Sequence, residues 1–345
     1  MAEPATETSV AQAGGATTTG AVKGKGAGSR FVEAFLVRRE ASILLVAIAL
    51  VIYFQSSSEQ FLSETNLRTL AQFMAAAAII AAGEVMLMIL GEIDLSVGMV
   101  FALTAFNMRF ALDAGMPLLL AVVLAIAAAA FIGFANGAVT VWFGVPSFIT
   151  TLGTLFLLNG LTLTLSNGTP RETPPQSALT DVLGQSPYSG LVWAVIIVCA
   201  LQLVLRQTRW GLHTIAAGGN PVGAAEAGIR TSRVRIGNFM LCSALAGFVG
   251  ILEALRIQSI DPLAGGNNIM FLAISAAVIG GTALSGGAGT VLGAFIGAVV
   301  LAVLRNGFTL QGVNAFTFDL ILGIAILLSM ILSVYLGRMR KAGRV

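Results

Sequence analysis

The sequence has little charge and few of the side chains that usually carry out chemistry. Only 10% of its 345 residues are Asp, Glu, Lys or Arg, and it contains one His and two Cys, whereas soluble domains have roughly 25% charged residues. A net charge of +3 is too small to indicate a nucleic-acid partner. His213 alone forms no metal cluster, and we interpret Cys199 and Cys242, which lie in apolar runs, as small core residues.

Catalytic and nucleotide-binding motifs are also missing. The sequence contains no phosphate loop of the form G-x-x-x-x-G-K-[ST], no H-E-x-x-H and no G-x-S-x-G, so an intramembrane enzyme has little support. The segment Leu284-Ser-Gly-Gly287 is similar to the nucleotide-clamping signature of ATP-binding cassette ATPases, but that signature works only beside a phosphate loop. We therefore expect no hydrolysis by this chain, and any ATPase that drives it must be a separate protein.

Long hydrophobic runs dominate what remains. Residues of hydrophobic type make up 57% of the chain, and several runs reach the roughly 20 residues that cross a bilayer core as a helix. We predict an all-α polytopic membrane protein with about ten transmembrane helices in contact with membrane lipid. The predicted spans are 41–55, 69–90, 97–114, 117–142, 147–166, 190–206, 236–255, 268–285, 289–305 and 317–336.

Basic residues set the predicted orientation. An even number of spans puts both termini on one side, and placing them in the cytoplasm also places 14 of the 19 Lys and Arg residues there. Because basic residues are retained on the cytoplasmic side, this orientation is strongly favoured. The inward-facing basic residues are Lys23, Lys25, Arg30, Arg38, Arg39, Arg206, Arg209, Arg230, Arg233, Arg235, Arg338, Arg340, Lys341 and Arg344.

The segments outside the spans differ in composition. Residues 1–35 are rich in Ala, Gly and Thr without the apolar core of a secretory signal, so we expect a disordered cytoplasmic tail. Residues 36–340 form the transmembrane domain, followed by a basic tail at 341–345. The polar segment 207–235 has short helical patterns interrupted at Pro221, which is typical of a docking element rather than a spacer. The outward loop 167–190 contains four prolines and is expected to be irregular.

Several polar side chains lie within or beside the apolar spans. A carboxylate near the bilayer centre costs roughly 2.5–3.5 kcal/mol on insertion scales, so each one needs a partner or a function. For Glu84, a buried contact between helices and a place on a transport pathway remain alternatives, and Asp94 is positioned to cap the helix that follows it. The candidate pathway or inner-turn residues are Glu84, Glu92, Asp94, Ser96 and Asn159.

Other spacings indicate structural roles. Arg109 and Asp113 lie four residues apart and Glu253 and Arg256 three apart, so each pair shares a helix face and is interpreted as an ion pair. Gly289, Gly293 and Gly297 repeat at a spacing of four, which places them on one face of a helix, where a neighbouring helix can approach closely.

Four motifs occur in one order along the chain. They are Gly-Glu-Ile-Asp-Leu-Ser-Val-Gly at 91–98, Val-Pro-Ser-Phe-Ile-Thr-Thr-Leu-Gly-Thr at 145–154, the polar loop 217–229, and Val-Ile-Gly-Gly-Thr-Ala-Leu-Ser-Gly-Gly at 278–287 with Arg-Asn-Gly at 305–307. On these motifs the chain resembles the membrane-spanning permease subunit of ribose-type (monosaccharide) ABC importers from about residue 60 to 340. Glu92 stands where that family has Gly.

The resemblance implies a bacterial inner-membrane transport subunit that passes a monosaccharide or polyol into the cell. It also implies its partners: an ABC ATPase subunit that binds ATP and magnesium, an extracytoplasmic sugar-binding protein, and a second permease copy in a homodimer. The residues that match the family's ATPase-coupling loop are Asn220, Pro221, Ala224, Ala225, Glu226, Gly228 and Ile229. The alternative is a proton-coupled secondary sugar transporter in which Glu84 or Asp94 titrates. The sequence contains no pattern that identifies which sugar is transported.

Overall fold

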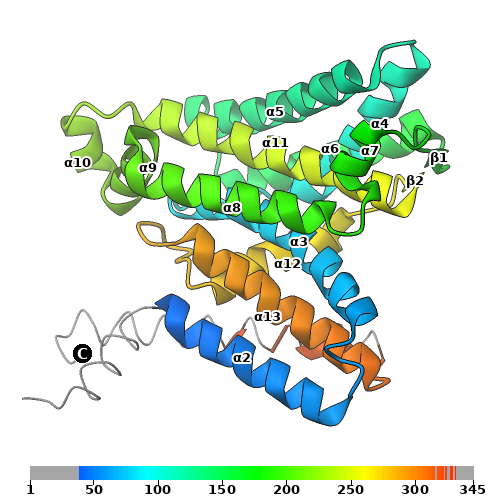
Figure 1. Ribbon diagram of the computed structural model, residues 1–345. Coiled ribbons are helices and arrows are strands. Elements are labelled where there is room, and N and C mark those ends of the chain that lie inside the picture. Colours follow the sequence, from blue (N-terminus) through cyan, green and yellow to red (C-terminus); the bar gives the residue numbers. More distant parts are fainter. Residues whose placement is uncertain (1–38, 315–316, 322, 325–326, 329–330, 332–345) are drawn as a thin grey trace, which may run out of the picture. The chain divides into compact units, whose positions relative to one another are not determined.

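The computed structural model describes residues 39–314, 317–321, 323–324, 327–328 and 331. Half of the predicted tenth span, and the predicted tails 1–35 and 341–345, lie outside these residues. The elements in chain order are α2 (Arg39–Ser57), α3 (Glu64–Met88), α4 (Val97–Asp113), α5 (Leu118–Trp142), α6 (Ser147–Ser166), β1 (Arg171–Glu172), α7 (Ala178–Thr180), η1 (Asp181–Gln185), α8 (Ser189–Gln207), α9 (Arg209–Gly219), α10 (Pro221–Glu226), α11 (Thr231–Ile257), β2 (Ser259–Ile260), α12 (Gly266–Ile279) and α13 (Val291–Leu310) (Figure 1).

Helices long and apolar enough to cross a membrane make up most of the described chain. Seven meet both criteria, namely α2, α3, α5, α6, α8, α11 and α13. The predicted spans 97–114 and 268–285 fall on the shorter helices α4, with 17 residues, and α12, with 14. The prediction for α12 was too long because the helix ends at Gly280 and Gly281, the second of which has a φ of +86°. The all-α polytopic class is confirmed.

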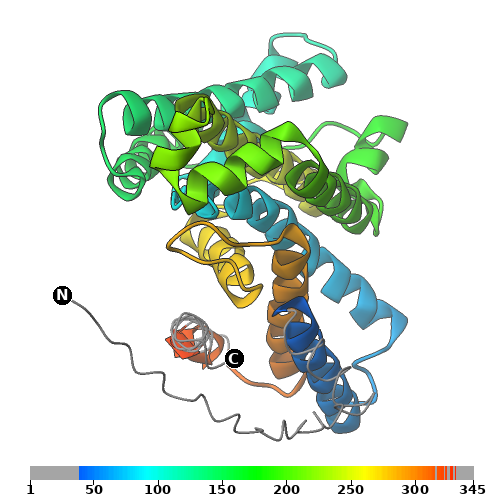
Figure 2. The same ribbon diagram turned by 90° about the vertical axis from the view of Figure 1, so that its left-hand side faces the viewer.

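Helix α3 lies inside the protein, whereas several other long apolar helices are largely exposed. Its most apolar window is 78% buried, against 28% for the corresponding window of α5. The alanine-rich run of α3 at 75–82 is almost entirely buried, and its small side chains let neighbouring helices approach closely. Helix α2 packs along α13 (Figure 2) through a small cluster of Phe54, Phe61 and Val303.

Helices α12 and α13 approach each other through glycine. A Cβ on Gly293 would lie 2.2 Å from the carbonyl oxygen of Gly280, and one on Gly297 would lie 2.1 Å from that of Ala276. The predicted three-glycine face is wrong at one position. Gly289 precedes the helix, which begins at Val291 after the Thr290 cap, and it faces Thr282 instead.

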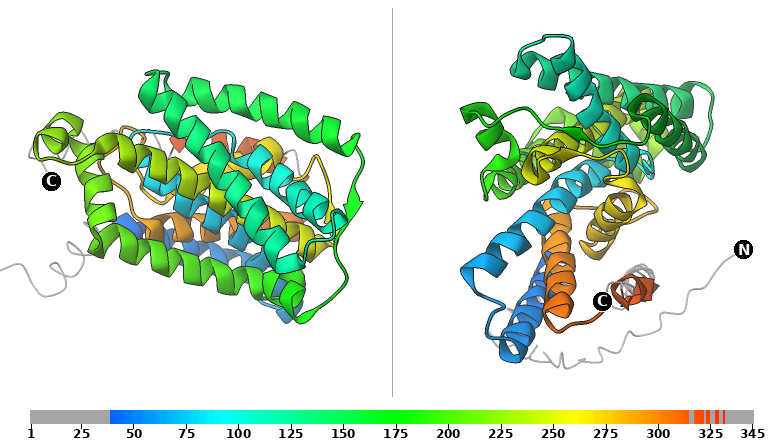
Figure 3. Two further views of the ribbon diagram at one scale, coloured as in Figure 1. Left: turned by 90° about the horizontal axis from the view of Figure 1, so that it is seen from above. Right: turned by 90° about the vertical axis from the view of Figure 1, so that its right-hand side faces the viewer.

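The two ends of the bundle carry different short elements. Helices α9 and α10 lie at the end where α8 finishes and α11 begins, while β1, β2 and α7 lie at the opposite end (Figure 1; Figure 3, left). The expectation of an irregular loop at 167–190 was wrong only in part, because β1, α7 and η1 lie within it while residues 173–177 belong to no helix or strand. Strand β1 pairs antiparallel with β2, and Ser177 forms a capping box at the start of α7. The prolines that motivated the expectation lie outside these short elements.

Candidate functional site

Helix α9 is fixed to α11 by a buried side-chain network. The indole nitrogen of Trp210 donates to Asn238 Oδ1 at 2.8 Å, and Asn238 Nδ2 donates to Thr214 Oγ1 at 3.1 Å. Asn238 is fully buried. The Trp210 ring occupies the space above Gly237, where a Cβ would lie 2.2 Å from a ring carbon. A short polar helix is thereby held firmly against the end of a membrane-spanning one.

The C-terminal end of α9 also meets α3 and the loop before α13. A Cβ on Gly218 would lie only 1.8 Å from the carbonyl oxygen of Ile89, the residue that follows α3. The same oxygen accepts a 2.7 Å hydrogen bond from the backbone nitrogen of Gly287, whose φ is +77°. Three backbone segments therefore converge here without intervening side chains.

Helix α10 is anchored on one side and exposed on the other. Asn220 caps it, accepting from the backbone nitrogen of Gly223 at 3.0 Å, and Pro221 occupies its first position. Ala224 is buried in a small apolar cluster with Leu90, against which Ile229 also packs. The predicted coupling residues that face solvent are Asn220, Pro221, Ala225, Glu226 and Gly228.

The exposed side of α10 also presents an apolar side chain. Val222 is 69% exposed. The helix is followed by Gly228, whose φ of +82° turns the chain back toward α11. Helix α10 therefore has a buried underside at Ala224 and an exposed side that carries Val222 and Glu226.

The turn between α3 and α4 is tied to the same end of the bundle. Glu92 Oε1 lies 3.6 Å from Arg235 Nε, near the start of α11. This separation exceeds hydrogen-bonding distance, so the contact is an electrostatic pair and not a hydrogen bond. The glutamate that replaces the usual glycine thus faces a cation supplied by the segment after α10.

Glu84, Asp94 and Ser96 belong to one buried network. All three are fully buried. Asp94 Oδ1 accepts from the backbone nitrogen and the hydroxyl of Ser96 at 2.9 and 2.5 Å, and its Oδ2 accepts from Ser243 on α11 at 3.1 Å. Glu84 accepts from Cys242 at 3.6 Å and from the Asp94 backbone nitrogen at 3.5 Å.

The prediction that Asp94 caps the next helix is wrong, because the N-cap lies two residues later, at Ser96. Helix α4 begins at Val97 with Ser96 as its N-cap, and Asp94 bonds the cap residue and not the first turn of the helix. The reason is local, because a carboxylate bonding the backbone nitrogen two residues ahead forms an Asx turn. Asp94 therefore shapes the turn that leads into α4.

The network continues across α5 and α6. Asn136 Nδ2 donates to Ser96 Oγ at 3.0 Å, and Thr154 Oγ1 donates to Asn136 Oδ1 at 2.6 Å. Asn159, the remaining candidate, is partly buried on α6 and makes no side-chain hydrogen bond within the described residues. For Glu84, Asp94 and Ser96 the geometry favours a contact that joins helices, since each polar group has a partner.

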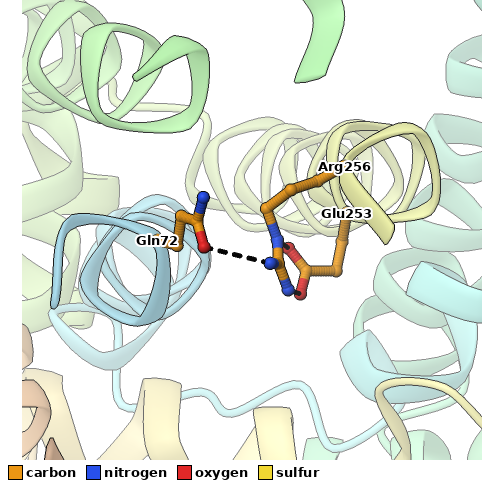
Figure 4. A network of polar contacts seen from close by, with 3 residues as sticks. All are labelled: Gln72, Glu253 and Arg256. Atoms are coloured by element: carbon orange, nitrogen blue, oxygen red, sulfur yellow. Dashed lines mark hydrogen bonds and ion pairs between the residues drawn. The ribbon is translucent and has the colours of Figure 1, made fainter. Parts of the chain in front are cut away.

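A second polar cluster lies toward the other end of the bundle (Figure 4). Arg256 forms two contacts with Glu253, one of them Nε to Oε2 at 2.8 Å, and its Nη1 donates to Gln72 Oε1 on α3 at 3.2 Å. The predicted Glu253–Arg256 ion pair is confirmed. The Arg109–Asp113 pair is confirmed as well, at 2.7 Å.

Beside this cluster lies a cavity of about 360 Å³. Sequence reasoning attached no site to it. Its lining includes one polar residue from each of four helices, namely Gln72, Glu253, Asn268 and Arg305, with aromatic residues Phe73 and Phe101. Gln72 is a single amide in an apolar run and Asn268 follows Asn267 at the start of another, a signal too common to have indicated a cavity without tertiary structure.

Residues 66–330 match the model of a family described as branched-chain amino acid transport system / permease component. Among individual proteins, the chain is 38% identical over 311 residues to the xylose/arabinose import permease protein XylH of Sulfolobus acidocaldarius, covering 88% of this chain and 87% of the relative.

Two further relatives are similar over comparable lengths. The ribose import permease protein RbsC of Escherichia coli is 34% identical over 308 residues, covering 87% of this chain and 95% of the relative. The autoinducer 2 import system permease protein LsrC of Yersinia enterocolitica is 34% identical over 311 residues, covering 88% and 84%. No solved structure matches the chain.

Proposed function

Because the chain belongs to the family of branched-chain amino acid transport system permease components, we propose that it is the membrane-spanning permease subunit of an ABC importer that admits a monosaccharide or related polyol. The relatives named above are import permeases for pentoses or for autoinducer 2, which favours this function over a proton-coupled secondary transporter. The observation that carries the mechanism is the rigid attachment of α9 and α10 to the bundle.

The proposal assigns the source of energy to other chains. The sequence has no phosphate loop, so ATP and magnesium bind to a separate ABC ATPase subunit that docks on α10. An extracytoplasmic binding protein delivers the sugar, and a second copy of this permease completes the pathway as a homodimer in the cell membrane. In this assembly the chain transmits force and guides the substrate, and it does not act as an enzyme.

Rigid-body movement explains how docking could drive transport. The ATPase subunit would contact Val222 and Glu226, which are exposed on α10. A displacement of α10 reaches α9, and α9 is fixed to α11 through Trp210 and Asn238. Packed elements with direct backbone contacts move together and do not deform separately.

The topology follows from the same proposal. Ten spans with both termini in the cytoplasm place the coupling loop 207–235 inside the cell, with a tail at 1–35, the transmembrane domain at 36–340 and a basic tail at 341–345. The distribution of Lys and Arg supports this orientation. The location of α9 and α10 at the opposite end from β1 and β2 supports it as well.

Uptake by the reconstituted assembly tests the proposal. Proteoliposomes containing the permease, the ATPase subunit and ATP, supplied with the binding protein, should accumulate sugar, and a proton gradient without the ATPase should not. Glu226→Lys is expected to reduce uptake at least about tenfold while the protein stays inserted and folded, since a lost docking contact worth about 1.4 kcal/mol changes an equilibrium tenfold. Gly228→Val is expected to reduce uptake as well, because valine at a φ of +82° strains the turn that follows α10.

Glu59→Lys provides the matched control, because Glu59 is equally exposed but lies in the loop between α2 and α3. Normal uptake by the Glu226 and Gly228 variants at normal ATPase levels would contradict the docking assignment. Accumulation of sugar without the ATPase would contradict the proposed function itself.

A further inference from the structure

We infer that the cavity bordered by Phe73, Asn268 and Arg305 is a monosaccharide-binding subsite within the permease, with Arg305 and Asn268 bonding hydroxyl groups and Phe73 contacting the C–H face of the ring. The inference rests on the proposed function and adds a site of substrate contact to it. It makes the permease itself a contributor to substrate selection.

The cavity has the size and position of a small-molecule site. Its volume of about 360 Å³ falls within the roughly 300–1,000 Å³ typical of small-molecule pockets. Helices α3, α4, α11, α12 and α13 all contribute to its walls. It lies toward the end of α11 that is opposite α9 and α10, where a sugar would enter under the proposed orientation.

Arg305 offers unused hydrogen-bond donors. Its guanidinium lies 4.9 Å from the ring centre of Phe73 and 5.8 Å from that of Phe318, so the aromatic rings orient it. Within the described residues it forms no ion pair with a carboxylate. A guanidinium carries five N–H donors in a fixed plane and no acceptor, which suits it to bind neighbouring hydroxyl oxygens.

Asn268 supplies the complementary chemistry. It lies in the first turn of α12, and its side chain is exposed and makes no hydrogen bond within the described residues. An amide offers both an acceptor and two donors, so Asn268 can accept a hydrogen bond from a sugar hydroxyl, which Arg305 cannot do. Together the two side chains match the donor and acceptor character of a sugar hydroxyl.

The remaining polar wall is already neutralised. Glu253 is paired with Arg256, whose Nη1 also donates to the side-chain oxygen Oε1 of Gln72 (Figure 4). The amide nitrogen of Gln72 makes no hydrogen bond within the described part of the chain, so it adds a further donor at the cavity wall. This arrangement supplies polarity without a free negative charge, as a neutral sugar requires.

A lipid chain is a poorer occupant than a sugar. An acyl chain filling the cavity would leave Arg305 and Asn268 without partners, and a polar group that is removed from water without a hydrogen-bond partner is destabilising. A monosaccharide instead presents hydroxyl groups at its edge and C–H groups on its faces, which matches the guanidinium and amide beside an aromatic ring.

Direct binding to the intact chain in lipid nanodiscs tests the subsite, with D-xylose, D-ribose and L-arabinose as probes in saturation-transfer NMR. We expect a signal for at least one sugar with the unaltered protein, and binding about tenfold or more weaker for Arg305→Gln and Asn268→Ala, as expected from the loss of a hydrogen bond. Asn267→Ala is the matched control, because Asn267 is equally exposed in the same turn but does not line the cavity.

Transport by the complete assembly separates the two proposals. If the unaltered system takes up sugar but no sugar binds to the nanodisc protein, or if the cavity variants bind and transport as the Asn267 control does, the subsite is refuted and the proposed function stands. If the unaltered system takes up no sugar with its ATPase and binding protein present, the proposed function fails and the subsite fails with it. Thermal unfolding of each variant establishes that a lost signal reflects the cavity and not a lost fold.

Discussion

Replacing Gly218 by alanine is expected to disrupt the contact between α9 and α3, whereas the same replacement at Gly219 is expected to have little effect. The two glycines are adjacent at the end of α9. A Cβ on Gly218 would lie 1.8 Å from the Ile89 carbonyl oxygen, while a Cβ on Gly219 would meet no heavy atom within 4 Å. The two substitutions therefore add the same methyl group in two different environments, one tightly packed and one open.

The size of the effect follows from the overlap. Ordinary contact begins at 3.4 Å, so the Gly218 backbone and Ile89 must separate by at least about 1.6 Å, the difference between 3.4 and 1.8 Å. Such a shift strains the 2.7 Å hydrogen bond from Gly287 to Ile89. Overpacking typically costs 1–3 kcal/mol and a lost hydrogen bond 0.5–1.5 kcal/mol, so we expect a destabilisation of about 2–4 kcal/mol.

Two measurements would register the change. Thermal unfolding of the purified chain in nanodiscs should show a clear decrease in stability for Gly218→Ala and a change within about 0.5 kcal/mol for Gly219→Ala. In the reconstituted assembly, Gly218→Ala should lower sugar uptake more than ATP hydrolysis, since movement of α10 is no longer passed to α3. Equal stability and equal uptake for the two variants would refute the assignment of α9 as a rigid link.

Two further predictions concern the same end of the bundle. Trp210→Phe should destabilise the protein by about 1–3 kcal/mol, because it leaves the buried Asn238 oxygen without its 2.8 Å donor. Thermal unfolding should show a smaller loss of stability for Trp193→Phe, because the Trp193 indole donates to a backbone carbonyl at an exposed site. Equal losses for the two variants would contradict the reasoning. Glu92→Gly and Arg235→Gln should show a coupling of at most about 1 kcal/mol in a double-mutant cycle, because the charges are 3.6 Å apart and partly exposed; a larger coupling would show that the pair is essential to the turn.

Hydropathy predicted the positions of the long described helices to within a few residues, because membrane helices must satisfy their backbone groups internally and so need long apolar segments. The limits of α6, for example, were predicted at 147–166 and observed there. The prediction was wrong where backbone geometry and not apolarity ends a helix. The predicted span 268–285 continued past Ile279 into Gly-Gly-Thr-Ala-Leu-Ser, but Gly280 and Gly281 end the helix, and the following segment to Thr290 forms a loop against α9.

Tertiary contacts limited what could be predicted about the polar residues. The sequence identified Asp94 and Ser96 as unusual, but the Ser243 hydroxyl that donates the hydrogen bond to Asp94 Oδ2 lies 149 residues away along the chain. The cavity was missed for a similar reason, since its amides come from α3 and α12 and become a site only when five helices meet. A single sequence does not show which residues that are distant along the chain meet in the folded protein.

The turn after α3 links the two halves of the proposed mechanism. Within eight residues the chain passes from Ile89, which contacts α9, to Ser96, which bonds Asn136 on α5. Movement of α9 would therefore reach α3 and the buried network that joins α4, α5, α6 and α11.

Helix α3 also extends to the cavity at the other end. From Gln72 to Ile89 it spans about 25 Å at 1.5 Å per residue, and most of this length is buried against other helices. Helix α11 makes the same connection, with Asn238 bonded to α9 at one end and Glu253 at the cavity wall at the other. Because two rigid helices join the docking elements to the cavity, we expect a shift of α10 on ATPase closure to change the separation of Gln72 and Glu253, and with it the affinity for a sugar bound there.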